Sequence, residues 1–313
     1  MTTAHISKSE KRACEICGKF ATLKCLETPT FYCSQMHFEY DWFGIRRLVF
    51  EETAHIRRGI PATASTRDER KALQSEFASV LKKVKTIAET EAKQNMISRR
   101  FELAISAGLE ALKMTQQLHA NESEMARCHL ILAEANLGLG KLDAAEEFLN
   151  LAAANINEKS ELTAQLQRSF GMLHRSQGKT AEAVRSFALF TYHTSVEFGT
   201  DSYQTALGYL MLGETFPSAE SANSERMISR ALDVYTKSFF WGNERVDGVE
   251  KSEVIDAIKK IKDRVTSHKE QTADCEGLLG VLTGEREHID LAKLLFAECS
   301  EAKLVRINEI GST

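Results

Sequence analysis

Two stretches near the middle of the chain align with each other without a gap, and this internal repeat is the feature that most restricts the possible fold. Residues 130–152 read LILAEANLGLGKLDAAEEFLNLA, and residues 168–190 read RSFGMLHRSQGKTAEAVRSFALF. Each copy contains a helix-forming stretch, a Gly-Lys turn and a second helix-forming stretch with a small residue on its buried side. With Gly140 aligned to Gly178, the matched positions are Leu132-Ala133 with Phe170-Gly171, Ala145 with Ala183, and Leu149 with Phe187.

Two weaker copies flank this pair. The earlier copy lacks the turn glycine but keeps small residues in its second helix, where Ala104 precedes Ala145 by 41 residues, whereas Ala145 precedes Ala183 by 38. A helix pair buries only one of its faces, so each copy needs a neighbour against which to stack. The later copy has an irregular turn at residues 216–219, and its small and apolar positions are Leu212-Gly213, Ile228 and Ala231.

The order of these residues, Leu followed by Ala or Gly, then Gly, Ala and Leu or Phe, resembles the tetratricopeptide repeat. Small residues are needed where the two helices of a pair cross closely, because a large side chain would push them apart. The usual period of this repeat is about 34 residues, so the copies here are longer and imperfect. The resemblance implies a mainly α fold with a tetratricopeptide-like α-solenoid. The alternative is an irregular helical bundle without superhelical stacking.

The composition agrees with a helical protein. Only 3 of 313 residues are proline, which interrupts helices, and 43% of the residues are hydrophobic, enough to exclude a wholly disordered chain. Apolar residues recur at helical spacing along residues 67–310, without an alternating strand-like run. Within this stretch, residues 250–310 are expected to form two or three helices that cap the apolar end of the array.

The sequence divides into a small and a large region. Residues 1–13 are polar and are expected to form a flexible tail, residues 14–58 a small finger, and residues 59–66 a linker. The repeats then occupy residues 67–245, and capping helices occupy residues 246–313. Thr66 followed three residues later by Glu69 is a capping-box pattern, so the first long helix is expected to begin near Arg67.

Four of the 7 cysteines crowd together near the N-terminus. Cys14 and Cys17 have the CxxC spacing of a zinc knuckle, and Cys33 precedes His37 by four positions. A helix that begins near Ser34 would place the side chains of Cys33 and His37 on one face. Three thiolates and one imidazole are a common tetrahedral set for structural zinc. We therefore expect one structural Zn²⁺ ion held by Cys14, Cys17, Cys33 and His37.

This segment also resembles the MYND-type zinc finger, in its CxxC pair, its FYC at residues 31–33, and the DW at residues 41–42. Members of that family hold two zinc ions in an interleaved arrangement, and the resemblance assigns the four residues above to the first ion. Three of the four ligands of the second ion are missing, so we expect one ion, with apolar packing of Phe50 in place of the other. The second set of positions holds Cys25, Thr28, Arg46 and Phe50.

The alternatives for these cysteines are buried thiols without metal and a catalytic zinc site. A catalytic site keeps an open coordination position, whereas this set already supplies four ligands. The lysine methyltransferases that carry MYND fingers need a large β-rich domain, for which this chain has no strand-rich region. Phosphate-binding, dinucleotide-binding, HExxH and GxSxG motifs are absent, and we expect no catalytic residues and no enzyme activity. Weaker candidates, each expected to be packed or solvated, are Cys128, His129, His174, His193 and the lysine runs at residues 82–85 and 259–262.

The charge gives no reason to expect a nucleic-acid or membrane partner. Residues 1–60 contain 9 Lys and Arg against 7 Asp and Glu, and the remainder contains 31 against 37. A basic excess this small does not form an electrostatic footprint for either partner. The longest apolar runs are too short to span a membrane, and no signal peptide is visible. We therefore expect a cytoplasmic protein with reduced thiols.

The pairing of a MYND-like finger with a repeat array, and residues 129–149 in particular, resembles the axonemal MYND-finger proteins of motile cilia and flagella. The resemblance implies a non-catalytic scaffold of the axonemal cytoskeleton whose partners are inner-arm dynein components and a second tetratricopeptide protein, with tubulin as a further candidate. The alternative is a cytosolic tetratricopeptide adaptor for complex assembly or peptide binding. A chaperone-type peptide clamp needs matched polar residues along one groove, but Asn136 is followed at the equivalent position by His174.

Overall fold

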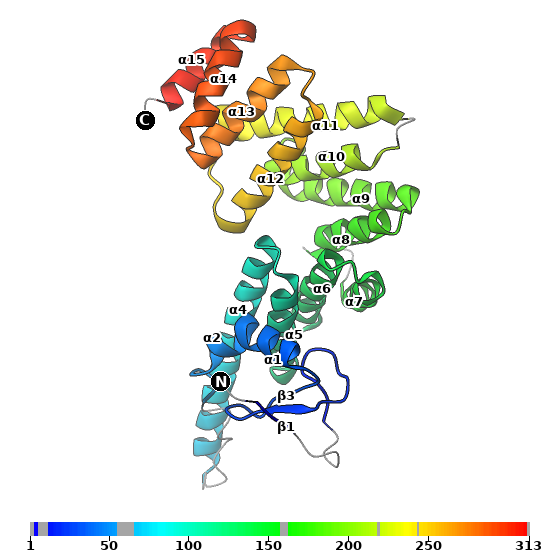
Figure 1. Cartoon of the computed structure of the whole chain (residues 1–313), viewed down its shortest axis with the longest axis vertical. Coiled ribbons are helices and arrows are strands. Elements are labelled where there is room, and N and C mark those ends of the chain that lie inside the picture. Colours follow the sequence, from blue (N-terminus) through cyan, green and yellow to red (C-terminus); the bar gives the residue numbers. More distant parts are fainter. Residues whose placement is uncertain are drawn as a thin grey trace. The chain divides into compact units, whose positions relative to one another are not determined.

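The chain is mainly helical and divides into two compact units, residues Met1–Leu162 and Thr163–Thr313 (Figure 1). The computed structural model describes residues 3–5, 12–54, 66–156, 162–217, 220–242 and 244–311. The first unit contains β1 (Thr3–His5), β2 (Leu23–Cys25), β3 (Phe31–Tyr32), α1 (Gln35–Asp41), the π-helical η1 (Trp42–Arg46), α2 (Arg47–Val49), α4 (Arg67–Ile97), α5 (Phe101–Gln117), α6 (Glu122–Gly138) and α7 (Leu142–Ala154). The second contains α8 (Leu162–Ser176), α9 (Thr180–Phe198), α10 (Tyr203–Thr215), α11 (Ser221–Tyr235), the π-helical η3 (Thr236–Trp241), α12 (Gly248–Arg264), α13 (Lys269–Thr283), α14 (Arg286–Cys299) and α15 (Glu301–Ile310).

The small N-terminal region is built on a three-stranded antiparallel sheet in the order β1-β2-β3. Thr3 pairs with Cys25 and His5 with Leu23, so the prediction of a flexible tail over residues 1–13 is wrong for residues 3–5. The polar sequence gave no sign of this strand, because its partner lies some twenty residues further on and backbone pairing does not need an apolar pattern. Behind the sheet, α1 contributes Phe38, whose ring meets Tyr32 edge-on at 5.4 Å between centroids.

The small region packs directly against the first long helices rather than standing apart from them. Ile45 and Val49 are fully buried in one apolar cluster with Val84 of α4 and Ala107 of α5. The π-helical segment η1 approaches α5 so closely that a Cβ at Gly44 would lie 2.9 Å from the carbonyl oxygen of Leu103. The region after the sheet therefore shares its core with the helices.

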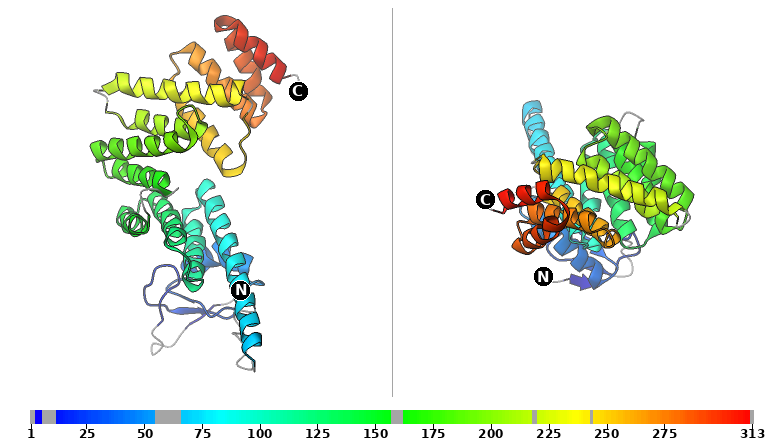
Figure 2. Two further views of the ribbon diagram at one scale, coloured as in Figure 1. Left: turned by 180° about the vertical axis from the view of Figure 1, so that it is seen from behind. Right: turned by 90° about the horizontal axis from the view of Figure 1, so that it is seen from above.

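The helices that follow are packed as neighbouring antiparallel pairs, which Figure 2 shows from two further directions. The first begins at Arg67 with the full capping box of Thr66 and Glu69, which confirms that predicted start. The expected linker before it, residues 59–66, lies outside the described residues except for Thr66.

The two aligned copies share one turn geometry. Gly140 and Gly178 have φ angles of 70° and 73°, in a backbone region that glycine adopts without the steric cost that other residues pay. In both turns the following residue donates its N–H to the carbonyl four positions before the glycine, at 2.9 Å. The α4–α5 turn has the same hydrogen bond, but Arg99 occupies the positive-φ position with φ 54°. The repeat thus extends to a copy whose turn glycine is missing.

Small residues lie where paired helices cross, as the repeat pattern predicts. Ala145 and Ala183 are both 0% exposed. In the α8–α9 pair, a Cβ at Gly171 would lie 2.5 Å from the ring of Phe187. The α10–α11 pair repeats this relation, because a Cβ at Gly213 would lie 2.7 Å from Ile228. The described helices therefore pack in the register that the sequence alignment gives.

Replacing Ala183 by leucine should destabilise the protein by about 1–3 kcal/mol, because extra carbon atoms would overpack the cluster formed with Phe187 and Met211. Urea unfolding followed by circular dichroism measures this change. Ala188→Leu on the same helix is the matched control, since Ala188 is exposed and a change there should stay within about 0.5 kcal/mol. An unchanged transition for Ala183→Leu would contradict the packing register.

The C-terminal part contains four helices, α12 to α15, instead of the two or three expected from the sequence. The expectation of two or three helices over residues 250–310 therefore missed at least one of them. The C-terminal helices do more than cover an end, because they share one apolar cluster with α10 and α11. Within that cluster Phe240 of η3 contacts Phe296 of α14, with ring centroids 5.8 Å apart.

Candidate metal centre

The first two candidate ligands lie on a tight turn at the start of the finger. The N–H of Gly18 donates to the carbonyl of Cys14 at 2.9 Å, and the N–H of Cys14 donates to the carbonyl of Lys19 at 2.8 Å. Gly18 has a φ of 67°, which allows the chain to reverse directly after Cys17. These local hydrogen bonds turn the two sulfur atoms toward the same point.

The second pair of candidate ligands comes from the end of β3 and the first turn of α1. Ser34 caps this helix, since its hydroxyl accepts a hydrogen bond from the backbone N–H of His37. This cap fixes the first turn, and the Nδ1 atom of His37 then lies 3.2 Å from the sulfur of Cys33. The predicted helix start near Ser34 and its consequence for the two side chains are confirmed.

Together the four side chains form a compact donor cluster. The ligand atoms of Cys14, Cys17, Cys33 and His37 all lie within 4.8 Å of one another, and no other such group occurs among the described residues. Cys17 and Cys33 have sulfur atoms 3.6 Å apart, and Cys14 lies 3.5 Å from Nδ1 of His37. A tetrahedral ion with metal–sulfur bonds of about 2.3 Å requires separations of roughly 3.6–3.8 Å between such ligands. The cluster could therefore hold a metal ion.

The protonation behaviour of these groups is consistent with a metal site. Burial, with a smaller contribution from Lys141 and Lys19, lowers the pKa of His37, which favours the neutral imidazole that binds metals. Burial opposes ionisation of Cys14, but backbone N–H groups outweigh it and hold the pKa of this thiol below its usual value. Burial and the neighbouring sulfur atoms raise the pKa of Cys17 to about 11. A bound cation would relieve that repulsion and release the proton.

Hydrogen bonds connect two of the positions that the resemblance assigns to a second ion, Thr28 and Arg46. Thr28 and Thr30 have hydroxyl groups 2.6 Å apart, and the Tyr32 hydroxyl lies 2.9 Å from Thr30. Tyr32 donates to the carboxylate of Asp41 at 2.6 Å, which also accepts from Nε of Arg46 at 2.7 Å. At these two positions of the second set, polar side chains therefore form hydrogen bonds and an ion pair with neighbouring protein groups.

The two remaining second-set positions are apolar in their surroundings. Cys25 is 1% exposed and lies in the apolar cluster of the finger, and it is not one of the four grouped donors. Phe50 packs edge-on against Trp42, with ring centroids 6.0 Å apart. The expected packing of Phe50 is therefore present in the structure.

Sequence reasoning did not find the ionic connection between the finger and the helices. Arg46 pairs not only with Asp41 but also with Glu110 of α5, at 2.9 Å, and all three groups are largely buried. No local pattern links residues 46 and 110, because the pair forms only after the finger packs on α5. The sequence signal that could have suggested a partner is a charged residue, Arg46, within segment 42–50, which is apolar apart from Arg46 and Arg47, because a charge that becomes buried needs an opposite charge nearby.

The weaker candidates do not join a common site. His174 lies 3.3 Å from the Ser186 hydroxyl and stacks on a neighbouring phenylalanine, and His193 lies beside Tyr192. Cys128 is buried in the core, whereas the ring of the adjacent His129 packs near Phe148.

Most of the lysines in the two runs are solvated as expected, since Lys82, Lys83, Lys259 and Lys260 are exposed, but one lysine of each run is partly buried. Lys85 pairs with Glu124 at 2.5 Å, and Lys262 pairs with the buried Glu276 at 2.7 Å. Both pairs join neighbouring helices, so these lysines have structural contacts that a solvated helix face would not provide.

Comparison with known protein families finds no family whose pattern matches this chain. Within the described residues, every helix is too short or too polar to cross a membrane.

Proposed function

We propose that this chain is a non-catalytic scaffold of the axoneme in motile cilia and flagella. In this proposal, a MYND-type finger holds one structural Zn²⁺ ion through Cys14, Cys17, Cys33 and His37, and a tetratricopeptide-like α-solenoid presents binding surfaces for other proteins. Three sulfur donors and one nitrogen donor suit zinc among the common metal ions.

The observation that carries the proposal is a cluster of four candidate metal donors in a finger whose later residues, Ile45 and Val49, pack onto α4 and α5. Four protein ligands leave a tetrahedral ion without an open position for a substrate or a reactive water molecule, which supports a structural role. Stacked helix pairs expose long surfaces that can hold more than one partner. The axonemal location and its partners, inner-arm dynein components and a second tetratricopeptide protein, rest on the sequence resemblance.

Detergent extraction of a flagellated cell that expresses the tagged protein tests the location. We expect the protein to remain with the microtubule skeleton after the membrane is removed, and to be released together with dynein in high salt. Complete release into the detergent-soluble fraction would contradict an axonemal role and favour the cytosolic adaptor.

A further inference from the structure

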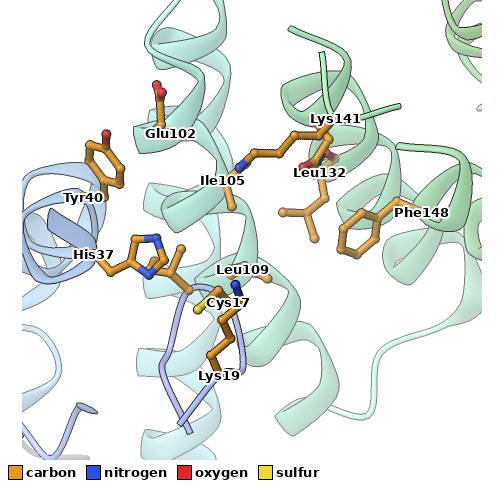
Figure 3. A pocket seen from close by; sticks show the side chains of 12 residues that line it. Cys17, Lys19, His37, Tyr40, Glu102, Ile105, Leu109, Leu132, Lys141 and Phe148 are labelled. Carbon is orange, nitrogen blue, oxygen red and sulfur yellow. Dashed lines mark hydrogen bonds between the residues drawn. The ribbon is translucent and has the colours of Figure 1, made fainter. Parts of the chain in front are cut away.

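A cavity of about 310 Å³ lies inside the first unit (Figure 3). It lies between the paired helices and the loop that carries Ile16, Cys17 and Lys19, called here the metal-binding loop. One wall comes from the finger, through residues 16–19 and the first helix of that region, and the opposite wall comes from α5, α6 and α7. No function proposed above uses this space. Because two of the four candidate metal ligands, Cys17 and His37, line it, its shape depends on the metal-binding loop.

The floor of the cavity is apolar. Leu132 is fully buried, Ile105 is buried, and Leu109 and Phe148 are partly buried beside them. Ile16 adds an apolar side chain from the finger. Pockets for small-molecule ligands span roughly 300–1,000 Å³, and this cavity is at the lower end of that range. Its volume therefore suits one or two side chains better than a nucleotide-sized cofactor.

The charged residues that line the cavity are Lys19, Lys141 and Glu102. Figure 3 shows Lys19 reaching in from the finger and Lys141 reaching in from the start of α7, whereas the carboxylate of Glu102 points away. Neither lysine forms an ion pair with any residue that the structure describes. A divalent ion bound by three thiolates carries one net negative charge, which two ammonium groups outweigh. The interior is therefore suited to an anionic group beside an apolar one.

We propose that this cavity docks a short acidic segment of a partner protein, with one apolar side chain entering the floor and a carboxylate lying between Lys19 and Lys141. The inference deepens the proposed scaffold function and rests on its protein-binding part, but not on the axonemal location. Removing the metal should release the loop that carries Ile16 and Lys19, so binding requires the metal-loaded protein.

Fluorescence anisotropy with short labelled peptide pools tests the proposal on the full-length, metal-loaded chain. The acidic pool has a central Leu, Ile, Met or Phe flanked by Asp and Glu. The basic pool replaces the flanking acids by Lys and Arg, and the polar pool replaces the central residue by Ser. We expect binding of the acidic pool alone, weakened by high salt because exposed charges are screened.

The variant Lys141→Glu should weaken binding of the acidic pool about tenfold, because it replaces attraction by repulsion. Lys179→Glu is the matched control. Lys179 precedes α9 with φ −84° and ψ 74°, and Lys141 precedes α7 with nearly the same angles, φ −84° and ψ 71°. Lys179 does not line the cavity. An acidic residue is favourable at either helix start, so both variants should fold.

Equal binding of the acidic and basic pools, no binding of any pool, or equal losses in the two lysine variants would overturn the docking proposal. Retention of the acidic pool after the metal has been stripped with a chelator would overturn its metal dependence. These measurements use purified protein, so they stand apart from the extraction experiment that tests the axonemal location.

Discussion

Replacing Cys14 by serine should reduce the metal content of the purified protein from about one equivalent to nearly none. Cys14 is 3% exposed and supplies one of only four clustered donor atoms. Three remaining ligands would leave an open, weaker site. Elemental analysis of protein purified in the presence of zinc measures this difference directly.

The same substitution should unfold the finger. Its own apolar cluster is small, and regions of this size usually need a metal or another cross-link to remain folded. For structural zinc in small units the binding free energy is about 10–16 kcal/mol, and it is also folding free energy. Limited proteolysis should therefore cut residues 12–54 in the variant before it cuts the helices.

Cys25→Ser is the matched control for this experiment. Cys25 is also buried in the finger, but it lies outside the donor cluster. We expect the variant to keep one equivalent of metal. Two equivalents in the unchanged protein would show that the altered second set still binds an ion, and a normal metal content in Cys14→Ser would exclude the proposed ligand set.

Loss of the finger should also weaken the adjoining helices. Ile45 and Val49 fill an apolar cluster with residues of α4 and α5, so their departure would expose Ala107 and Ala111 to water. The metal would in this way stabilise the cavity and the first helix pairs as well as the finger itself.

The parts of this structure that sequence could predict are those determined by local chain geometry. The donor cluster depends on a CxxC turn and on one helical turn between Cys33 and His37, so its spacing is visible in the sequence. The Gly-Lys turns and the capping box at Thr66 are equally local. Helix pairs follow from these local signals because each apolar face needs a neighbour.

The parts that sequence could not predict depend on contacts between distant residues. Strand β1 forms because Thr3 pairs with Cys25, and the polar segment has no pattern that specifies this partner. Lys262 meets the buried Glu276 only after two helices pack. The turn at Arg99 has a positive φ, like the turns at Gly140 and Gly178, but the sequence has no glycine there to indicate it.

Arg46→Met should destabilise the metal-loaded protein by about 3–5 kcal/mol, the usual cost of removing one partner from a buried ion pair. The Arg46 side chain is 11% exposed and lies 2.7 Å from Asp41 and 2.9 Å from Glu110. Burial opposes its charge, but these two carboxylates outweigh burial and raise the pKa of Arg46 above its already high value. Without the guanidinium, two buried carboxylates would lose their shared cation.

Urea unfolding of matched variants separates this effect from a general loss of packing. Lys113→Met removes a more exposed lysine that lies 3.7 Å from Glu15, and should cost less than about 1 kcal/mol. Combining Arg46→Met with Asp41→Asn and Glu110→Gln should recover much of the lost stability, since no unpaired charge would then remain buried. If the triple variant were no more stable than Arg46→Met, the loss would come from packing of the arginine stem, and the ion pair would not be what fastens the finger to α5.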